Sequence, residues 1–408
     1  MAADCRQHLL RIFNSALAAV NGCERVSRYL QQHPVSAPVF LLSIGKAAGA
    51  MARGAHEVLG ASIIDALVVT KQGYAESLPW PVLEAGHPLP DERSLAAGRR
   101  LIDFAAAIPP DASVLVLLSG GASALVEALP VGMQLAQLRA LNDWLLASGL
   151  DIVAMNRMRK RLSRIKGGRL ARLLSPRKLL CLAISDVPGD DPRAIGSGPL
   201  VADTSLQTAP DTSGLPPAVA ELLRSSPPAP GADDACFHHV QFEIIARLDD
   251  AKHAAAEAAR QLGYRVTLHP EFIEGDALAA GARLAQALKT APAGEVQVWG
   301  GETTLKLPPH PGQGGRNQSL ALAVALALHG QEKIWLLSAG TDGTDGPTPD
   351  AGALVDGGTI ARGEAEGQSA RRALAMADAG RFLAASGDLI QTGATGTNVM
   401  DLMLGLRA

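Results

Sequence analysis

The stretch 38-PVFLLSIGKAAGAMARG-54 joins an apolar run to a segment of small residues through a glycine and a lysine. The run 38–44 predicts a buried strand, because short β-branched and leucine-rich runs fill the interior of parallel sheets. Gly45 permits a tight turn, and Lys46 stands at the start of the expected helix, where unpaired amides favour an anion. A lysine at a helix start is also commonly just solvated, so this stretch alone leaves both interpretations open.

The same alternation of apolar runs and helical segments recurs along the whole chain. A first series of runs lies at 38–44, 63–69, 113–119 and 179–185, and a second series lies at 241–246, 265–269, 295–300 and 333–338. This pattern is typical of βαβ units, and 408 residues exceed what one hydrophobic core usually holds. We therefore predict an α/β fold class with two α/β domains of mostly parallel or mixed sheets. The segment 202–235 is rich in Pro, Ser, Thr and Asp and predicts a boundary near residue 232, giving domains 1–232 and 233–408.

The amino-acid composition argues against a nucleic-acid or membrane partner. Hydrophobic residues make up 47% and charged residues 19% of the chain, with a net charge of −3, which favours a soluble globular protein without a nucleic-acid partner. The four cysteines are scattered without a C-x-x-C pair, which fits a cytoplasmic location. Residues 1–20 have apolar side chains at helical spacing, so we expect an amphipathic helix there, and no run is long enough to predict a membrane span.

Glycine-rich loops follow several of the predicted strands in the first half. In open α/β sheets, ligands bind at the carboxyl ends of strands. The turn 118-LSGGASALVE-127 is shaped to wrap amides around an oxyanion or phosphate, and 184-ISDVPGDDPRAIGSGP-199 gathers three aspartates. The cationic helix 155–171 places Asn156 and Arg159 on one face, where they could meet an anionic ligand, although such a run is usually solvated. In 86-GHPLPDERS-94 we interpret His87 as a loop cap in preference to a general base.

The second half carries a comparable set of loops. Glu302 follows a predicted strand in 299-WGGETTLKL-307, and Arg316 precedes a predicted helix in 312-GQGGRNQSLAL-322. The loop 338-SAGTDGTDGPTPDAG-352 has the composition of a tight turn. Several carboxylates at the end of a strand are also suited to hold Mg²⁺ beside a phosphate. Both interpretations stand on the local sequence.

The residue types favour phosphoryl transfer, which needs mostly positioning and charge stabilisation from the protein. The sequence contains neither a G-x-x-x-x-G-K-[ST] nor a G-x-G-x-x-G pattern, so an ATP site would not be a P-loop and a conventional nicotinamide site is not indicated.

The motifs taken together resemble a known family. Their combination and order resemble the glycerate 2-kinases whose C-terminal part is the MOFRL domain; the motifs are 45-GKAAGAMA-52, 86-GHPLPDERS-94, 119-SGGASAL-125, 156-NRMRKRLSRIKGGRLA-171, 185-SDVPGDDP-192, 300-GGETT-304, 314-GGRNQ-318, 340-GTDGTDG-346 and 396-GTNVMDL-402. The resemblance spans nearly the whole chain. It implies a Rossmann-like N-terminal domain and a MOFRL C-terminal domain around an active-site cleft. It also implies transfer of the γ-phosphate of ATP, with Mg²⁺, to the 2-hydroxyl of D-glycerate, giving 2-phosphoglycerate.

The resemblance also suggests roles for individual residues. The expected catalytic residues are Lys46, Arg316, Asp186 and Asp190. Expected substrate-binding residues are Ser119, Gly120, Gly121, Ser123, Asn156 and Arg159. Expected nucleotide-binding residues are Glu302, Gly314, Gly315, Asn317, Thr341 and Asp345, with Asp342 and Asp345 as Mg²⁺ ligands.

Two alternatives remain at this level. Some relatives have carried the name hydroxypyruvate reductase, which predicts NADH or NADPH oxidation instead of ATP use. The second alternative is a sugar-acid-binding protein without catalytic activity. Such a protein would be stabilised by its ligand without converting it. The sequence leaves open whether the protein is a monomer or a homodimer.

Overall fold

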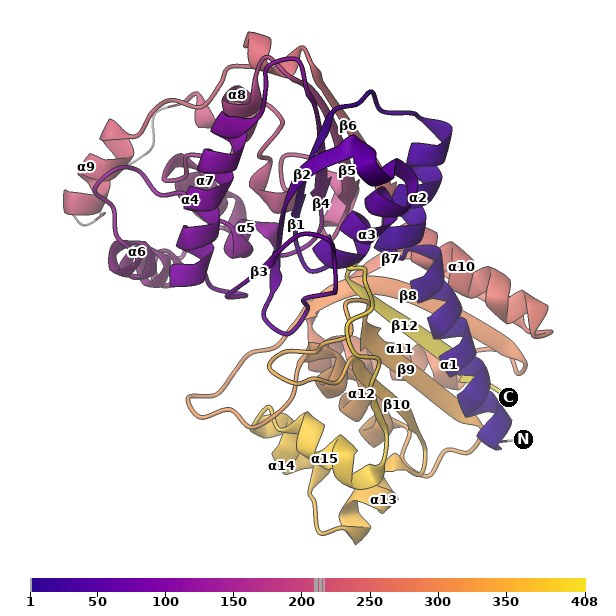
Figure 1. Cartoon of the computed structure of the whole chain (residues 1–408). Helices are drawn as coiled ribbons and strands as arrows, with labels where there is room; N and C mark the ends of the chain where they lie inside the picture. The colour runs from indigo at the N-terminus through magenta and orange to yellow at the C-terminus, as the bar shows by residue number, and fades with distance from the viewer. Residues whose placement is uncertain (1, 209–211, 213–214, 216) are drawn as a thin grey trace. The chain divides into compact units, whose positions relative to one another are not determined.

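The computed structural model describes residues 2–208, 212, 215 and 217–408 and divides into two compact units (Figure 1). The N-terminal unit is Gly22–Ile245, and the C-terminal unit combines Met1–Asn21 with Ala246–Ala408. This division differs from the boundary expected near residue 232, because the strand that follows that position belongs to the first sheet. Within the expected boundary segment 202–235, residues 209–211, 213–214 and 216 lie outside the described part of the chain.

The sheet of the N-terminal unit has six strands in the order β3-β2-β1-β4-β5-β6. Their bounds are β1 Val39–Ile44, β2 Ile63–Lys71, β3 Val82–Ala85, β4 Ser113–Leu118, β5 Lys178–Ile184 and β6 Val240–Ala246. Strands β1 to β5 pair in parallel. This is the Rossmann order, in which the chain changes direction across the sheet between β1 and β4, and ligands bind beyond the carboxyl ends of the strands at that point.

Helices cover both faces of this sheet. They are α2 Gly22–Gln32, α3 Ala48–Leu59, α4 Glu92–Ala107, α5 Ala122–Leu125 and α8 Arg169–Leu174, with short 3₁₀ turns η1 Gly60–Ser62, η2 Pro188–Asp190, η3 Ile195–Ser197, η4 Thr204–Leu206 and η5 Ala235–Phe237. Alternate residues of β1, such as Phe40 and Leu42, join one buried cluster with α4 and α8. Helix α3 contacts β1 and β2, and α2 packs on α3.

A group of three helices in the same unit has a hydrophobic core of its own. It consists of α6 Leu135–Ala147, α7 Ile152–Arg161 and α9 Pro217–Ser225. Its buried members include Leu141, Leu145, Met158 and Leu223, which form a cluster separate from the core under the sheet. We refer to α6, α7 and α9 as the helical lobe.

The sheet of the C-terminal unit is mixed, with the order β11-β10-β9-β12-β8-β7. Its strands are β7 Arg265–Asp276, β8 Glu295–Thr304, β9 Ile334–Gly340, β10 Gly352–Asp356, β11 Leu389–Ile390 and β12 Asp401–Arg407. Strand β12 lies between β8 and β9 and is antiparallel to both. The ends of β8 and β9 therefore meet the beginning of β12 at one edge, where Asp401 is in register with Gly301 and Gly340.

Helices also flank the second sheet. They are α1 Ala2–Ala19, α10 Leu248–Gln261, α11 Ala277–Thr290, α12 Arg316–Ala327, α13 Thr359–Ala365, α14 Ala370–Ala375 and α15 Ala379–Ser386. The amphipathic helix expected at the start of the chain is α1, which packs on α10 and contacts β12. Helices α11, α12 and α15 share a buried cluster with Trp299 and Met403. The two α/β sheets confirm the predicted fold class.

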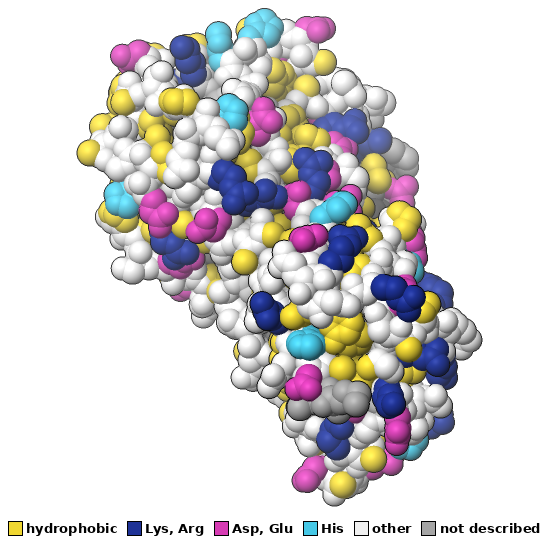
Figure 2. Space-filling model, turned by 90° about the vertical axis from the view of Figure 1, so that its right-hand side faces the viewer, with side chains coloured by type: hydrophobic (Ala, Val, Ile, Leu, Met, Phe, Trp, Pro, Cys, Tyr) yellow, Lys and Arg dark blue, Asp and Glu magenta, His cyan; other side chains and the backbone are white. Residues whose placement is uncertain are grey.

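The last two features of the fold are the apolar length of its helices and the side-chain types on its surface. None of the helices in the described part of the chain is long and apolar enough to cross a membrane. On the face drawn in Figure 2, basic and acidic side chains are interspersed among polar and apolar ones.

Candidate functional site

The loops that follow β1 and β4 are locked together by backbone contacts. The Lys46 amide donates to the Gly120 carbonyl at 2.9 Å, and the Ala47 amide donates to Ser119 Oγ at 3.0 Å. Gly45 has φ +133°, and a Cβ at this position would lie 2.1 Å from Ser119 Oγ. Only glycine satisfies both the dihedral angle and the close approach. The structure thus brings Lys46 and the Ser-Gly-Gly turn together, as the strand order requires.

Lys46 and His87 both reach the glycine at the start of α5. Gly121 has φ +84°, and a Cβ added there would lie 3.0 Å from His87 Cδ2 and 3.4 Å from Lys46 Cγ. The imidazole and the stem of the lysine therefore flank the same point of backbone. From the sequence, His87 was interpreted as a loop cap. Pro88 and Pro90 in the segment 86–94 were the sequence signal for a shaped loop there.

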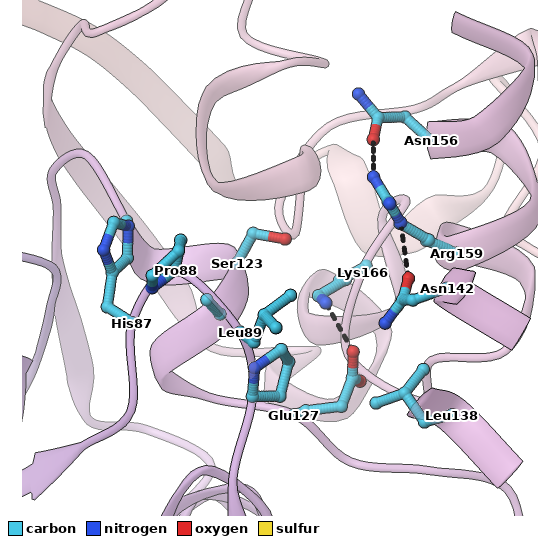
Figure 3. A pocket seen from close by; sticks show the side chains of 13 residues that line it. His87, Pro88, Leu89, Ser123, Glu127, Leu138, Asn142, Asn156, Arg159 and Lys166 are labelled. Atoms are coloured by element: carbon cyan, nitrogen blue, oxygen red, sulfur yellow. Dashed lines mark hydrogen bonds and ion pairs between the residues drawn. The ribbon is translucent and has the colours of Figure 1, made fainter. Parts of the chain in front are cut away.

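A pocket of about 250 Å³ opens beside this point (Figure 3). One wall comes from the sheet loops and the other from α6, α7 and the segment after α7. The lining residues are His87, Pro88, Leu89, Pro90, Gly121, Ser123, Ala124, Glu127, Leu138, Asn142, Asn156, Arg159 and Lys166. The predicted residues Gly121, Ser123, Asn156 and Arg159 therefore share one pocket. Ser123 Oγ also lies 2.8 Å from Ser197 Oγ.

Charged and amide side chains define the lobe side of the pocket. Arg159 Nε donates to Asn142 Oδ1 at 2.8 Å, and its Nη1 donates to Asn156 Oδ1 at 3.1 Å. Burial lowers the pKa of Arg159. Lys166 pairs with Glu127, and both side chains are buried. Asn142, Glu127 and Lys166 were not predicted as site residues, because a pairing between residues distant in sequence leaves no local pattern.

The two predicted acids of this unit lie in the loop after β5. Since β5 is parallel to β4, this loop reaches the same edge of the sheet as Lys46. Neither Asp186 nor Asp190 lines the pocket described above. Their neighbour Asp191 forms an ion pair with Arg193 at 2.8 Å, and hydrogen bonding from that guanidinium lowers the pKa of Asp191.

In the C-terminal unit, Arg316 is the first residue of α12, and two carboxylates from neighbouring strands hold its side chain. Its Nε and Nη2 donate to the two oxygens of Asp401 at 2.6 and 3.0 Å, and Nη1 lies 2.8 Å from Glu302 Oε1. Asp401 is 1% exposed, whereas the Arg316 side chain remains 34% exposed. Burial alone would lower the pKa of Arg316, but Asp401 and Glu302 together raise it. Asp401 thus holds Arg316. It lies in the motif 396–402, but the sequence assigned it no role.

Asp345 caps the same helix. Its Oδ1 accepts from the Asn317 amide at 3.1 Å, and its Oδ2 accepts from the Gln318 amide at 2.7 Å. A carboxylate at a helix N-terminus satisfies amides that have no partner within the helix and interacts favourably with the helix dipole. Gly315 is required beside it, since a Cβ there would lie 2.3 Å from Asp345 Cγ. Complete burial nevertheless raises the pKa of Asp345 to about 7.

The remaining predicted residues of this unit surround the cap. Thr341 is fully buried, and its hydroxyl donates to the Met400 carbonyl and accepts from the Val399 amide. Asn317 is also buried and accepts from Ser338 Oγ. Gly314 is buried next to the start of α15. These residues form the frame of the loop cluster.

The carboxylates fit a magnesium ion only in part. Among the described residues, no group of three or more His, Cys, Asp or Glu side chains is arranged to hold a metal ion by itself. Mg²⁺ commonly takes one or two carboxylates and completes its shell with water and phosphate oxygens. Both oxygens of Asp345 already accept backbone amides, which argues against this residue as a ligand. Asp342 stays the candidate ligand because it directly follows β9 and lies near Asp401: a Cβ placed on Gly340 would lie 3.3 Å from Asp342 Oδ1 and 3.5 Å from Asp401 Oδ1. Asp342 Oδ1 also accepts from the Thr344 amide at 3.0 Å.

The fold and the pocket define a two-unit α/β protein with a small-molecule site at the switch point of its parallel sheet. Residues 8–212 match a family described as a domain of unknown function (DUF4147), and residues 295–401 match the MOFRL family. The chain is 38% identical to a D-glycerate 2-kinase of Thermotoga maritima over 90% of each chain. It is also 38% identical to an Agrobacterium vitis protein with a provisional name as a hydroxypyruvate reductase, over 89% of this chain and 97% of the relative.

The fold is also similar to that of a solved structure. The crystal structure of glycerate kinase from Thermotoga maritima superposes with a TM-score of 0.86 at 34% identity, over the full length of both chains. The chain belongs to the glycerate 2-kinase family with a C-terminal MOFRL domain, as the motifs suggested.

Proposed function

We propose that this protein is a glycerate 2-kinase that phosphorylates the 2-hydroxyl of D-glycerate with ATP. The observation that carries the proposal is the pocket at the β1–β4 switch point, which combines a small volume of about 250 Å³ with a half-buried arginine. Such a site suits a small polar anion better than an extended ligand. The relationship to a D-glycerate 2-kinase at 38% identity supports the choice of substrate.

In the proposed reaction, the 2-hydroxyl oxygen of glycerate forms a bond to the γ-phosphorus of ATP, and the bond to the leaving oxygen of ADP breaks. The hydroxyl proton passes to a base. Such a transfer requires positive charge, and Lys46 and Arg316 are the expected catalytic cations of the two units. The amides of Ser119, Gly120 and Gly121 are suited to oxyanions of the substrate or of the phosphoryl group.

Three side chains are candidates for the general base. Asp186 and Asp190 follow a strand at the correct edge of the sheet, whereas His87 lines the pocket itself. A general base must be within hydrogen-bond reach of the proton that it removes. We therefore add His87 to the two aspartates as a candidate.

ATP and Mg²⁺ are the cofactors that the proposal requires. Mg²⁺ would neutralise the developing charge on the phosphate oxygens. We assign Asp342 as its protein ligand, with Asp345 and Asn317 supporting the loop. Glu302 holds Arg316 in place and is also a candidate for contact with the nucleotide, beside Gly314, Gly315 and Thr341.

Two coupled assays test the proposal against its main alternative. Purified protein with ATP, Mg²⁺ and D-glycerate should release ADP, and phosphorus NMR should identify 2-phosphoglycerate. A hydroxypyruvate reductase would instead oxidise NADH or NADPH with hydroxypyruvate and show no ATP requirement. Appearance of 3-phosphoglycerate would refute the position of transfer. Stabilisation by glycerate without any turnover would indicate a binding protein.

The cellular setting follows from the same proposal. ATP is available in the cytoplasm, and the four cysteines are buried thiols that fit a reducing compartment. We therefore propose a cytoplasmic enzyme that acts on a small molecule, as a monomer or a homodimer.

A further inference from the structure

Arg159 differs from two neighbouring lysines in how its charge is compensated. On the same stretch of chain, Lys160 pairs with Asp203 at 2.7 Å and Lys166 pairs with Glu127. Arg159 is bound instead by the neutral side-chain oxygens of Asn142 and Asn156. Within the described part of the chain, no carboxylate forms an ion pair with it. The pocket thus contains one cation that is oriented but not neutralised.

This arrangement is costly unless a ligand supplies the missing charge. Transfer of a cation out of water is unfavourable without a partner of opposite sign. A carboxamide oxygen can orient a guanidinium, but it carries no net charge. The guanidinium also keeps N–H groups that neither asparagine uses, and a planar fork of this kind matches the two oxygens of a carboxylate.

Asn142, which accepts from Arg159 Nε, is itself held within the fold. Asn142 lies on α6 and is buried, and Asn156 lies on α7 together with Arg159. Next to Asn142 in sequence, Leu141 packs in the core of the helical lobe, where it joins Met158 from α7. Figure 3 shows the guanidinium between the two carboxamides, across the pocket from His87. The hydrogen bond to the buried Asn142 therefore orients the guanidinium of Arg159 without a ligand.

We propose that Asn142 is a positioning residue that holds Arg159 as the receptor for the carboxylate of a small 2-hydroxy acid. The neutrality of Asn142 is essential to this role, since an acid in its place would occupy Arg159 permanently. This inference rests on the proposed function and specifies which group of the substrate binds the lobe. It orients the carboxylate toward Arg159 and leaves the 2-hydroxyl toward Gly121, the side at which Lys46 lies.

The test is the substitution Asn142→Asp, which changes charge but hardly changes shape. The new carboxylate would lie where Oδ1 now accepts from Arg159 and would compete with the substrate. We expect the KM for D-glycerate to rise about tenfold to hundredfold, as for loss of a charge-assisted hydrogen bond, with kcat and the KM for ATP nearly unchanged. D-Glyceramide, which lacks the negative charge, should lose little or no affinity in the same variant.

A matched control and a second variant keep the result interpretable. Gln134→Glu adds the same charge at an exposed position just before α6 and should leave the KM for D-glycerate unchanged. Asn142→Ala removes the holder without adding charge, so its effect should be smaller than that of Asn142→Asp and should fall on both ligands. Thermal unfolding of each variant verifies that it is folded.

The possible outcomes separate this inference from the proposed function. If the wild type phosphorylates D-glycerate and Asn142→Asp shows an unchanged KM, or loses glyceramide equally, the role of Asn142 is refuted. If the wild type is stabilised by D-glycerate without phosphorylating it, and Asn142→Asp abolishes that stabilisation, the inference stands and the kinase activity is refuted. If D-glycerate neither binds nor reacts with the wild type, both are wrong.

Discussion

Replacement of Asp345 by Asn should change how the stability of the C-terminal unit depends on pH. The folded state raises the pKa of Asp345 from 3.8 to about 7, because burial outweighs the hydrogen bonds from the Gln318 and Asn317 amides. Between these two values, the folded protein holds a proton that the unfolded chain releases. The contribution of this group to stability is therefore complete below pH 3.8 and is lost as the pH rises through about 7.

The size of the change in the free energy of unfolding follows from the raised pKa of Asp345. The difference is roughly three pKa units, each about 1.4 kcal/mol, so the free energy of unfolding should fall by about 4 kcal/mol across this interval. The variant Asp345→Asn has no titrating group at this position, so its profile should be flatter by that amount. It should also lose about 1–3 kcal/mol at every pH, because the amide nitrogen of Asn would oppose a backbone donor.

Urea unfolding at a series of pH values measures how the free energy of unfolding depends on pH. In a background with Trp80→Phe and Trp144→Phe, the remaining tryptophans Trp299 and Trp335 report on the C-terminal unit alone. The exposed Glu366→Gln serves as the matched control, since it makes the same change from acid to amide on the surface. Identical pH slopes for the wild type and Asp345→Asn would refute the argument that burial dominates the electrostatics of this cap.

Three further substitutions address catalysis and the fold. Arg316→Lys keeps the charge but not the two-point contact with Asp401, so we expect kcat to fall about hundredfold in the coupled ADP assay, and a near-normal kcat would contradict a role in transfer. Lys46→Ala should lower kcat about thousandfold while circular dichroism stays unchanged, and a change in KM alone would assign Lys46 to binding. Gly45→Ala would force a Cβ to 2.1 Å from Ser119 Oγ at φ +133°, so thermal unfolding should show a loss of at least about 3 kcal/mol, and wild-type stability would show that the loops can separate.

The loops that carry the site could be located from the sequence, but the roles within them could not. Lys46, Ser119 and Gly121 were predicted from their position after apolar runs, and the strand order β1-β4 then brings them together. Asp342 and Asp345, which follow β9, were predicted as metal ligands. Asp345 instead caps α12 with both oxygens, because burial and the approach of the helix decide which carboxylates remain available.

The sequence by itself determined the α/β class and the family, because apolar periodicity and glycine-rich turns are properties of neighbouring residues. The run 241–246, which was expected to begin the second series, instead forms β6 of the first sheet. Only the tertiary structure decided how charges are compensated. Arg316 meets Asp401 across 85 positions of sequence, and Arg159 meets Asn142 across 17. Whether a cation is neutralised or left for a ligand depends on such distant pairings, and burial makes each of them energetically decisive.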